Sequence, residues 1–187
     1  ASAFQYIKHQ ALRLTFEFDS AARTRDVLYV CGTVDKKDTL HVFVNHWPSR
    51  RGGQAASEPR RIAAAKLVRA KIDSIQAASP EANIILMGDF NDHAEDKSLH
   101  QTLRAKHHKE ELAAKDLFNY MYELGKNWKM GSHKYQGHWG TLDHLIVSSN
   151  LTQKRENRLH ASEKGANIFS GRFLLEQDKK YLGLQPF

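Results

Sequence analysis

The chain has 187 residues, of which 41% are hydrophobic and 10% aromatic, and its formal net charge at pH 7 is +7. This composition excludes a disordered polar tail and predicts one soluble domain, residues 1–187, that is long enough to bury a core. No apolar run approaches the roughly 20 residues that a membrane-spanning helix needs. The single cysteine, Cys31, excludes an intrachain disulfide and a multi-cysteine zinc site. The positive charge favours polyanionic partners such as nucleic acid, phosphorylated molecules or anionic lipid.

The first half of the chain predicts strands and then a long helix. Residues 13–18 alternate between polar and apolar, and residues 27–34 and 40–45 read as two further strands. A basic loop rich in turn residues follows at 47–53.

The long helix is predicted to open with Ser57 as its N-cap and Pro59 in its first turn, and to end before Pro80. Apolar residues recur at helical spacing, while charged residues lie off this stripe. The stripe comprises Ala64, Val68, Ile72 and Ile75, and the charged residues are Arg69, Lys71 and Asp73. With the next strand at 84–87, the order strand–helix–strand predicts an α/β layered fold.

The second half predicts helices at 99–109 and 116–124, a loop or irregular strand at 126–140, and a strand at 142–148. Beyond residue 149 the chain is charged with short apolar pieces.

The stretch from Asn83 to Asp92 carries the clearest functional signal. Four apolar residues end at Gly88, Asp89, Phe90 and Asn91, as expected of a buried central strand that leads into a turn. On an extended chain, Asp89 and Asn91 would point to one side, which would place a carboxylate and an amide together for cation or phosphate chemistry. A structural Asx turn is the alternative.

Other polar groups lie at the ends of neighbouring strands. His46 ends one strand, and Asp143 begins another. Beside His46, Arg50 and Arg51 precede two glycines and would present guanidinium groups and backbone N–H groups to a phosphate. Each feature alone is typical of a solvated loop or strand end, but together in a basic chain they indicate a phosphate-directed site.

Other kinds of site are predicted less strongly. Residues 89–93 resemble the opening of a calcium loop, but Ala94 and His100 occupy the positions of its glycine and terminal glutamate. The histidines lack HExxH spacing, and no G-x-S-x-G pattern is present. Trp47 is the aromatic residue expected nearest the site, with core packing as the alternative.

Taken together, these motifs resemble the endonuclease/exonuclease/phosphatase superfamily, the deoxyribonuclease I-like proteins. The matching segments, in order, are Asn45-His46-Trp47-Pro48-Ser49, Gly88-Asp89-Phe90-Asn91-Asp92 and Leu142-Asp143-His144-Leu145-Ile146-Val147-Ser148. The resemblance implies that the chain forms part of a four-layer αββα sandwich. It also implies hydrolysis of phosphodiesters or phosphomonoesters with Mg²⁺, or with Mn²⁺ or Ca²⁺ in its place.

The resemblance also implies a role for each site residue. His46 would contact the scissile phosphate, and Asp89 would activate the attacking water or help to hold the metal. Asn91 would donate a hydrogen bond to a phosphoryl oxygen, and Asp143 would orient a partner histidine. The implied phosphate-binding residues are Arg25, Arg50 and Arg51.

The departures from the family pattern matter equally. The family has an asparagine on an early strand and a metal-binding glutamate after it, and neither has a match before residue 25 of this chain. The Ser-Asp-His motif that closes the family pattern has no match after Asp143. We therefore expect a segment that is incomplete at both ends, with His46 and Asp143 under-paired and with weak or no activity on its own. The alternative is a non-catalytic basic module that binds nucleic acid or a phospho-ligand. The resemblance implies a phosphate-containing substrate, which is left open among nucleic acid, a phospholipid head group and an inositol phosphate. The oligomeric state and the compartment are also left open, although a removed leader would place the protein in the periplasm or outside the cell.

Overall fold

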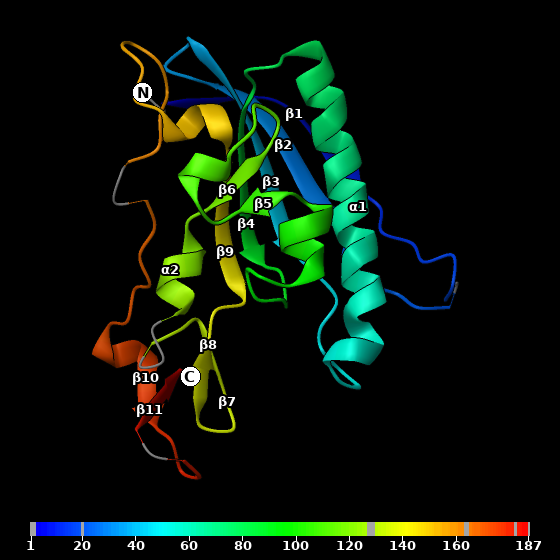
Figure 1. Ribbon diagram of the computed structural model, residues 1–187, viewed down its shortest axis with the longest axis vertical. Helices are drawn as coiled ribbons and strands as arrows, with labels where there is room; N and C mark the ends of the chain where they lie inside the picture. The colour runs from blue at the N-terminus through cyan, green and yellow to red at the C-terminus, as the bar shows by residue number, and fades with distance from the viewer. Residues whose placement is uncertain (1–2, 20, 127–129, 163–164, 182, 187) are drawn as a thin grey trace.

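In the computed structural model, the long helix α1 lies against one face of a seven-stranded sheet (Figure 1). The structure describes residues 3–19, 21–126, 130–162, 165–181 and 183–186. The sheet order is β1-β2-β3-β4-β9-β6-β5, and two separate ribbons pair β7 with β8 and β10 with β11.

The strands are β1 (Phe4–Leu12), β2 (Val27–Val34), β3 (Asp38–His46), β4 (Asn83–Asp89), β5 (Ala105–Lys106), β6 (Leu117–Asn119), β7 (His133–Tyr135), β8 (His138–Gly140), β9 (Asp143–Ser148), β10 (Leu175–Gln177) and β11 (Leu184–Pro186). The helices are α1 (Gln54–Ala78) and α2 (Met121–Gly125). A π turn lies at Ser98–Thr102, and 3-10 turns lie at Lys109–Glu111, Ser149–Thr152 and Arg172–Leu174. None of the helices in the described part of the chain is long and apolar enough to cross a membrane.

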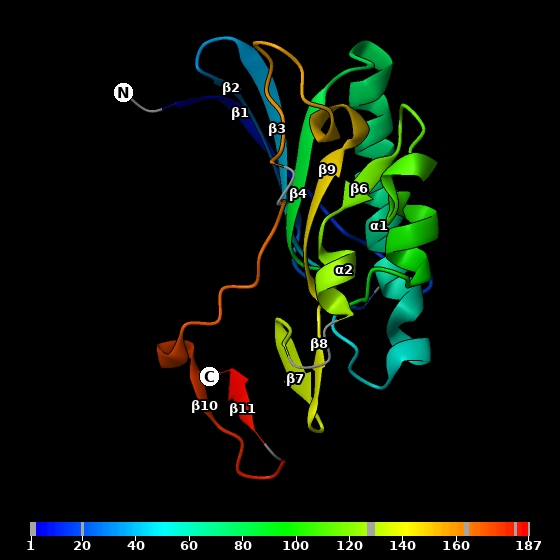
Figure 2. The same cartoon turned by 60° about the vertical axis from the view of Figure 1, so that its left-hand side comes forward.

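Strand β4 is central, as predicted, but only one of its faces is fully buried. Ile84 and Leu86 are inaccessible and belong to the core cluster that includes the buried face of α1, whereas Met87 is 38% exposed. Because cross-strand partners share a face, Met87 lies in register with further apolar residues on the side away from α1: Leu28, Val44 and Leu145. The chain thus builds one helix layer and one sheet layer (Figure 2). Exposed apolar side chains form a row on the second face of the sheet.

The parallel pairing of β3 with β4 across α1 confirms the predicted strand–helix–strand unit. The predicted helix start was wrong, because α1 begins at Gln54 after Gly53, whose φ is 104°. The Ser57 hydroxyl lies inside the helix and donates to the Gly53 carbonyl at 2.6 Å, so it does not cap the helix. Pro59 follows in the second turn and has no N–H to donate to the carbonyl of Ala55. Because Ala55 is exposed, water can bond to this carbonyl instead.

The apolar stripe of α1 is confirmed, since Ala64, Val68 and Ile72 are inaccessible. Arg69 was predicted to lie off this stripe, but the structure buries it. Its side chain is 8% exposed, and its guanidinium donates to Gln76 Oε1 at 2.6 Å within the core side of the helix.

The helix predicted at 99–109 is a single π turn followed by the short strand β5. Leu99 and Leu103 are both inaccessible, which explains the helical spacing, but Arg104 has φ of 63° and ends the turn. The helix predicted at 116–124 was also mostly wrong, because Leu117 to Asn119 are buried and pair with β9, which leaves only α2 helical.

The alternating segment 13–18 is not a strand, although Leu14 and Phe16 are buried as the alternation suggested. The edge strand is β1 instead, whose residues are mostly exposed and therefore carry little hydrophobic pattern. The strands predicted at 27–34, 40–45 and 142–148 are confirmed as β2, β3 and β9. The segment 126–140 contains the hairpin β7–β8, with residues 127–129 outside the described part.

Candidate functional site

Three polar side chains meet at one end of the open face of the sheet. In the register of the strands, His46 on β3 lies opposite Asp89 on β4, and Asp89 lies opposite Asp143 on β9. The distance from His46 Nε2 to Asp89 Oδ2 is 3.8 Å. The sheet therefore brings together the histidine and the two carboxylates that the sequence placed in three separate motifs.

The environment of Asp89 raises the pKa of its carboxyl group. Burial raises the pKa of Asp89 most, the hydrogen bond from the Asn91 N–H lowers it, and the charge of Asp143 raises it further. His46 lowers this pKa by a smaller amount. The net upward shift makes Asp89 a better proton acceptor, once ionised, than an ordinary surface aspartate.

The turn after β4 requires its glycine. Gly88 has φ of 122°, and a Cβ atom there would lie 2.0 Å from the Asn45 carbonyl oxygen. The expectation that Asp89 and Asn91 share one side of an extended chain was wrong, because Asn91 has φ of 52° and has left the strand. Its backbone N–H donates to Asp89 Oδ1 at 2.8 Å, and its Nδ2 donates to the Trp47 carbonyl at 2.9 Å. The Asx turn and the polar cluster thus coexist, and one amide hydrogen of Asn91 is already engaged.

Trp47 packs in the core against the site loop and does not line the site. The side chain is inaccessible, and its ring packs edge-on against Phe90 with the centroids 4.7 Å apart. Its Nε1 donates to Asn45 Oδ1 at 2.9 Å. Trp47 therefore has the core-packing role, directly under the loop that carries Asn91.

Asp92 anchors the site loop and was not singled out from the sequence. Its carboxylate is inaccessible and lies 2.7 Å from Nε of Arg61, which is also inaccessible, although the N–H direction does not meet hydrogen-bond geometry. Ser98 and Gln54 donate to the same carboxylate at 2.5 and 2.9 Å. The available signal was the position of Arg61 at helical spacing from the apolar stripe, which predicts an inward-facing side chain.

His144, adjacent to Asp143, is structural. Its Nε2 donates to the Asp92 carbonyl at 2.9 Å, and its Nδ1 lies 3.1 Å from Asn119 Nδ2. Burial lowers the pKa of His144 to about 4, so the ring is neutral near pH 7. This neutral ring ties the site loop to β9 and β6.

The predicted phosphate-binding arginines have different environments. Arg50 is held by the site loop, since its Nε donates to the Asn91 carbonyl at 2.7 Å and its guanidinium is 2.9 Å from Asp96. Arg51 is exposed, as is Arg25 on the loop before β2. The structure therefore gives Arg50 a partner for its charge and leaves Arg25 and Arg51 exposed.

A groove of about 760 Å³ lies between the basic loop and the β7–β8 hairpin, which projects beyond the end of β9 (Figure 1 and Figure 2). Arg50 and Arg51 line one side, Tyr135 and Trp139 line the other, and Asn91 contributes from the site. The groove thus combines positive charge with aromatic surface beside the His46–Asp89–Asp143 row.

The carboxylates meet part of the requirement for a divalent cation. Within the described residues, no three His, Cys, Asp or Glu side chains come together as a metal site. The charge of Asp143 nevertheless raises the pKa of Asp89, so a cation between them would relieve a repulsion. Mg²⁺ is commonly held by one or two carboxylates, with water and substrate phosphate as its other ligands, and Asp89 and Asp143 fit that pattern.

The pairing expected for His46 differs from the pairing found. His46 was expected to lack an acidic partner, but Asp89 lies at 3.8 Å because β3 and β4 end at the same level. The Asp143 carboxylate has no ion-pair or hydrogen-bond partner among the residues that the structure describes. Asp143 is therefore the member of the row with a free carboxylate.

Comparison with solved structures supports the fold. The human Nocturnin catalytic domain with bound sulfate anion matches with a TM-score of 0.54 and 17% identity, over 78% of this chain and 48% of that one. Truncated Caenorhabditis elegans TDP2 also matches with a TM-score of 0.54 and 17% identity, over 79% and 54% of the two chains. The chain thus spans about half the length of these solved structures. Their likeness confirms the predicted α/β, deoxyribonuclease I-like fold.

Comparison of sequences identifies the family. The chain matches none of the curated proteins with which it was compared. A family model described as "Endonuclease/Exonuclease/phosphatase family" matches residues 1–186. This match covers nearly the whole chain and agrees with the fold and with the order of the three motifs. The chain belongs to the endonuclease/exonuclease/phosphatase family.

Proposed function

We propose that this chain carries the phosphate-facing part of a divalent-metal-dependent phosphoesterase. The observation that carries the proposal is the in-register row of His46, Asp89 and Asp143 on three adjacent strands. Family membership supports hydrolysis of phosphoester bonds as the general class of reaction. The metal requirement is proposed from the two carboxylates.

Each residue of the row has a separate task. Asn91 N–H holds Asp89 Oδ1, which leaves Oδ2 to orient a water and accept its proton. The His46 side chain is 47% exposed, so its ring can reach a phosphoryl oxygen and stabilise the charge that develops there. A cation bound by Asp89 and Asp143 would neutralise charge on the phosphate. Phosphoryl transfer depends mainly on positioning and charge neutralisation, which are the tasks assigned to these residues.

The proposal is tested first with generic substrates. Hydrolysis of bis(p-nitrophenyl) phosphate and p-nitrophenyl phosphate is measured with Mg²⁺ or Mn²⁺, and again with EDTA. We expect slow, EDTA-sensitive hydrolysis that Asp89→Asn abolishes. Asp35→Asn, in the exposed β2–β3 turn where φ is 50° and asparagine is tolerated, is the matched control. Equal rates for Asp89→Asn and wild type would refute the assignment.

Metal binding is tested without turnover. Mn²⁺ should broaden the NMR signals of the Asp89 and Asp143 backbone amides in the wild type. In Asp89→Asn, the same additions should leave these signals sharp. Broadening that is confined to other surface carboxylates would overturn the proposed ligands.

A second function is supported by a different observation. The described residues contain no three-ligand metal group, and basic residues line the groove. A non-catalytic module that binds nucleic acid or a phospho-ligand would show these features. It is favoured if hydrolysis and Mn²⁺ broadening are both absent while anions still bind the groove.

A further inference from the structure

A second basic pocket lies on the other side of the loop that carries Arg51. It has a volume of about 540 Å³ and is enclosed by the loop before β2, by the turn after β3 and by the second turn of α1. Four arginines line it: Arg23, Arg25, Arg51 and Arg60. Three separate segments of the chain therefore contribute arginines to the lining of one hollow.

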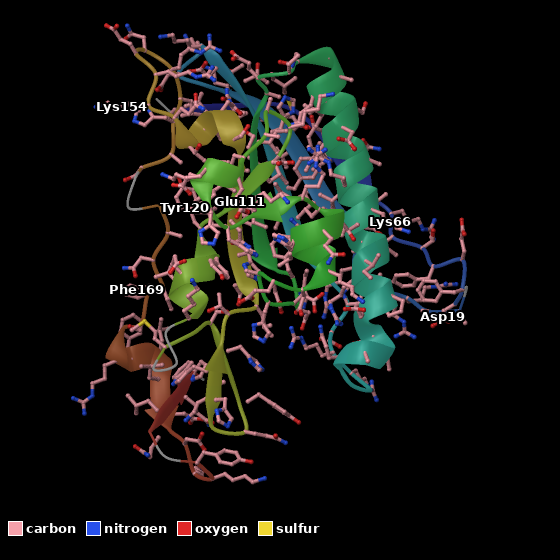
Figure 3. All side chains as sticks on the ribbon, in the orientation of Figure 1. Asp19, Lys66, Glu111, Tyr120, Lys154 and Phe169 are labelled. Atoms are coloured by element: carbon pink, nitrogen blue, oxygen red, sulfur yellow. The ribbon has the colours of Figure 1, made fainter. Side chains whose placement is uncertain are left out.

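The positive charge of this four-arginine pocket is only partly neutralised. Asp19, on the loop beside the N-terminal half of α1 (Figure 3), pairs with Arg60 at 2.6 Å. Within the part of the chain that the structure describes, Arg25 and Arg51 have no ion-pair or hydrogen-bond partner for their guanidinium groups, and no carboxylate lines the pocket. Arg25 and Arg51 therefore contribute positive charge that no described carboxylate pairs with, and this charge attracts an anion.

The four-arginine pocket adjoins the candidate site. Arg51 lines both this pocket and the groove that contains Asn91. The two hollows therefore adjoin one short loop, and the same arginine borders both. An anionic ligand with charges spaced along its length can occupy both at once.

We propose that the four-arginine pocket binds a second phosphate group of the substrate, away from the phosphate that faces Asp89. The inference rests on the proposed function and deepens it, because it assigns a substrate with at least two phosphates. Arginine is suited to this role, since its planar fork binds phosphate oxygens in pairs and stays charged at all physiological pH values. A nucleic acid strand and a polyphosphorylated small molecule share this chemistry.

Binding measured in EDTA, with the whole chain, tests the pocket separately from catalysis. One probe is a fluorescein-labelled oligothymidylate of about ten nucleotides, a length within the range of single-strand binding sites. The other is inositol hexakisphosphate, followed by calorimetry. The pocket variant is Arg23→Gln/Arg60→Gln. The control, Arg155→Gln/Arg172→Gln, removes the same charge at positions that do not line the pocket.

We expect the pocket variant to bind at least one probe about tenfold more weakly, as befits the loss of charged hydrogen bonds. For the oligonucleotide, the slope of log affinity against log salt should fall by about 0.7 for each phosphate that the variant no longer neutralises. The control should match wild type in salt slope. Weaker binding of the oligonucleotide alone indicates a strand, and weaker binding of inositol hexakisphosphate alone indicates a small molecule.

The inference is overturned if the pocket and control variants have equal affinities and salt slopes for both probes. Hydrolysis of nitrophenyl esters in that case would leave the proposed function standing without the second phosphate site. Conversely, pocket-dependent binding without hydrolysis and without Mn²⁺ broadening would keep the anion site and favour the non-catalytic binding module. A folded pocket variant is verified by circular dichroism, and Arg25→Gln provides an independent test because Arg25 has no partner to lose among the described residues.

Discussion

Replacing Asp92 by asparagine tests whether a buried ion pair holds the candidate site in place. Both Asp92 and Arg61 are inaccessible, and their charged atoms are 2.7 Å apart. Asparagine keeps the shape and can still bond Gln54 and Ser98, so the change removes mainly the charge. Removal of one partner from a buried pair costs about 3–5 kcal/mol. Because Arg61 also bonds Ser57 Oγ and Gln54 Oε1, we expect the lower end, about 3 kcal/mol.

The assay is equilibrium unfolding in urea. With a slope of about 2 kcal/mol per molar urea, a loss of about 3 kcal/mol lowers the midpoint by about 1.5 M. The control is Glu81→Gln, which removes a carboxylate that is 61% exposed and paired with Arg155, and should cost less than about 1 kcal/mol. Similar costs for Asp92→Asn and Glu81→Gln would refute the reasoning.

A double-mutant cycle separates the ion pair from other effects of the change. Arg61→Met should cost less in the Asp92→Asn background than in the wild type, because the guanidinium has already lost its counter-charge. Equal costs in both backgrounds would show that Arg61 and Asp92 are not energetically coupled.

Three further predictions concern protonation and packing. Burial lowers the pKa of His144 to about 4 in the folded protein, against about 6.5 when unfolded. The contribution of the neutral ring to the free energy of unfolding is therefore complete above pH 6.5, and about 3 kcal/mol of it is lost as the pH falls from 6.5 through 4. His144→Gln should flatten this pH dependence, which urea unfolding at several pH values measures. Asp143→Asn should lower the pKa of Asp89, because it removes the nearby negative charge, while burial continues to raise that pKa. An NMR titration of the Asp89 carboxyl carbon measures the change, and an unchanged pKa would show that Asp143 lies too far from Asp89 to affect it. Phe43→Ala should cost about 3–5 kcal/mol because Phe43 is inaccessible, whereas Val44→Ala should cost less than about 1 kcal/mol because Val44 is already 41% exposed; equal urea midpoints would contradict the one-sided burial of β3.

The strands that carry the site could be predicted because their signals are local. An apolar run that stops at Gly88 and Asp89 identifies both the strand and its end, and Gly88 is needed by its own φ and by the close approach of Asn45. His46, Asp89 and Asp143 were each at a strand end in the sequence. Their alignment depended on register between β3, β4 and β9, which the order of motifs implied only through the family resemblance.

The features that could not be predicted depend on contacts that are distant in sequence. Leu99 and Leu103 have helical spacing, yet Arg104 adopts a left-handed conformation that ends the turn. Asp92 has the sequence context of a polar turn residue, and its burial depends on Arg61 from α1, which lies 31 positions earlier. The charge of Arg61 would itself predict an exposed side chain. Tertiary pairing thus overrides the local pattern where a charged side chain is neutralised inside the core.

Carboxylates beside a basic groove present a physical conflict that the proposed chemistry resolves. The arginines attract phosphate, whereas Asp89 and Asp143 repel it, and the half-buried Asp89 also bears the cost of desolvation. A module that only binds phosphate would hold it more tightly without them, so in EDTA Asp89→Asn should strengthen oligothymidylate binding. If the row serves a cation, Mg²⁺ should favour binding to the wild type relative to Asp89→Asn, in which Mg²⁺ acts only as a competing counterion of the oligonucleotide. An identical Mg²⁺ response in both proteins would show that the two carboxylates do not hold a cation against phosphate, and would favour the binding module over the enzyme.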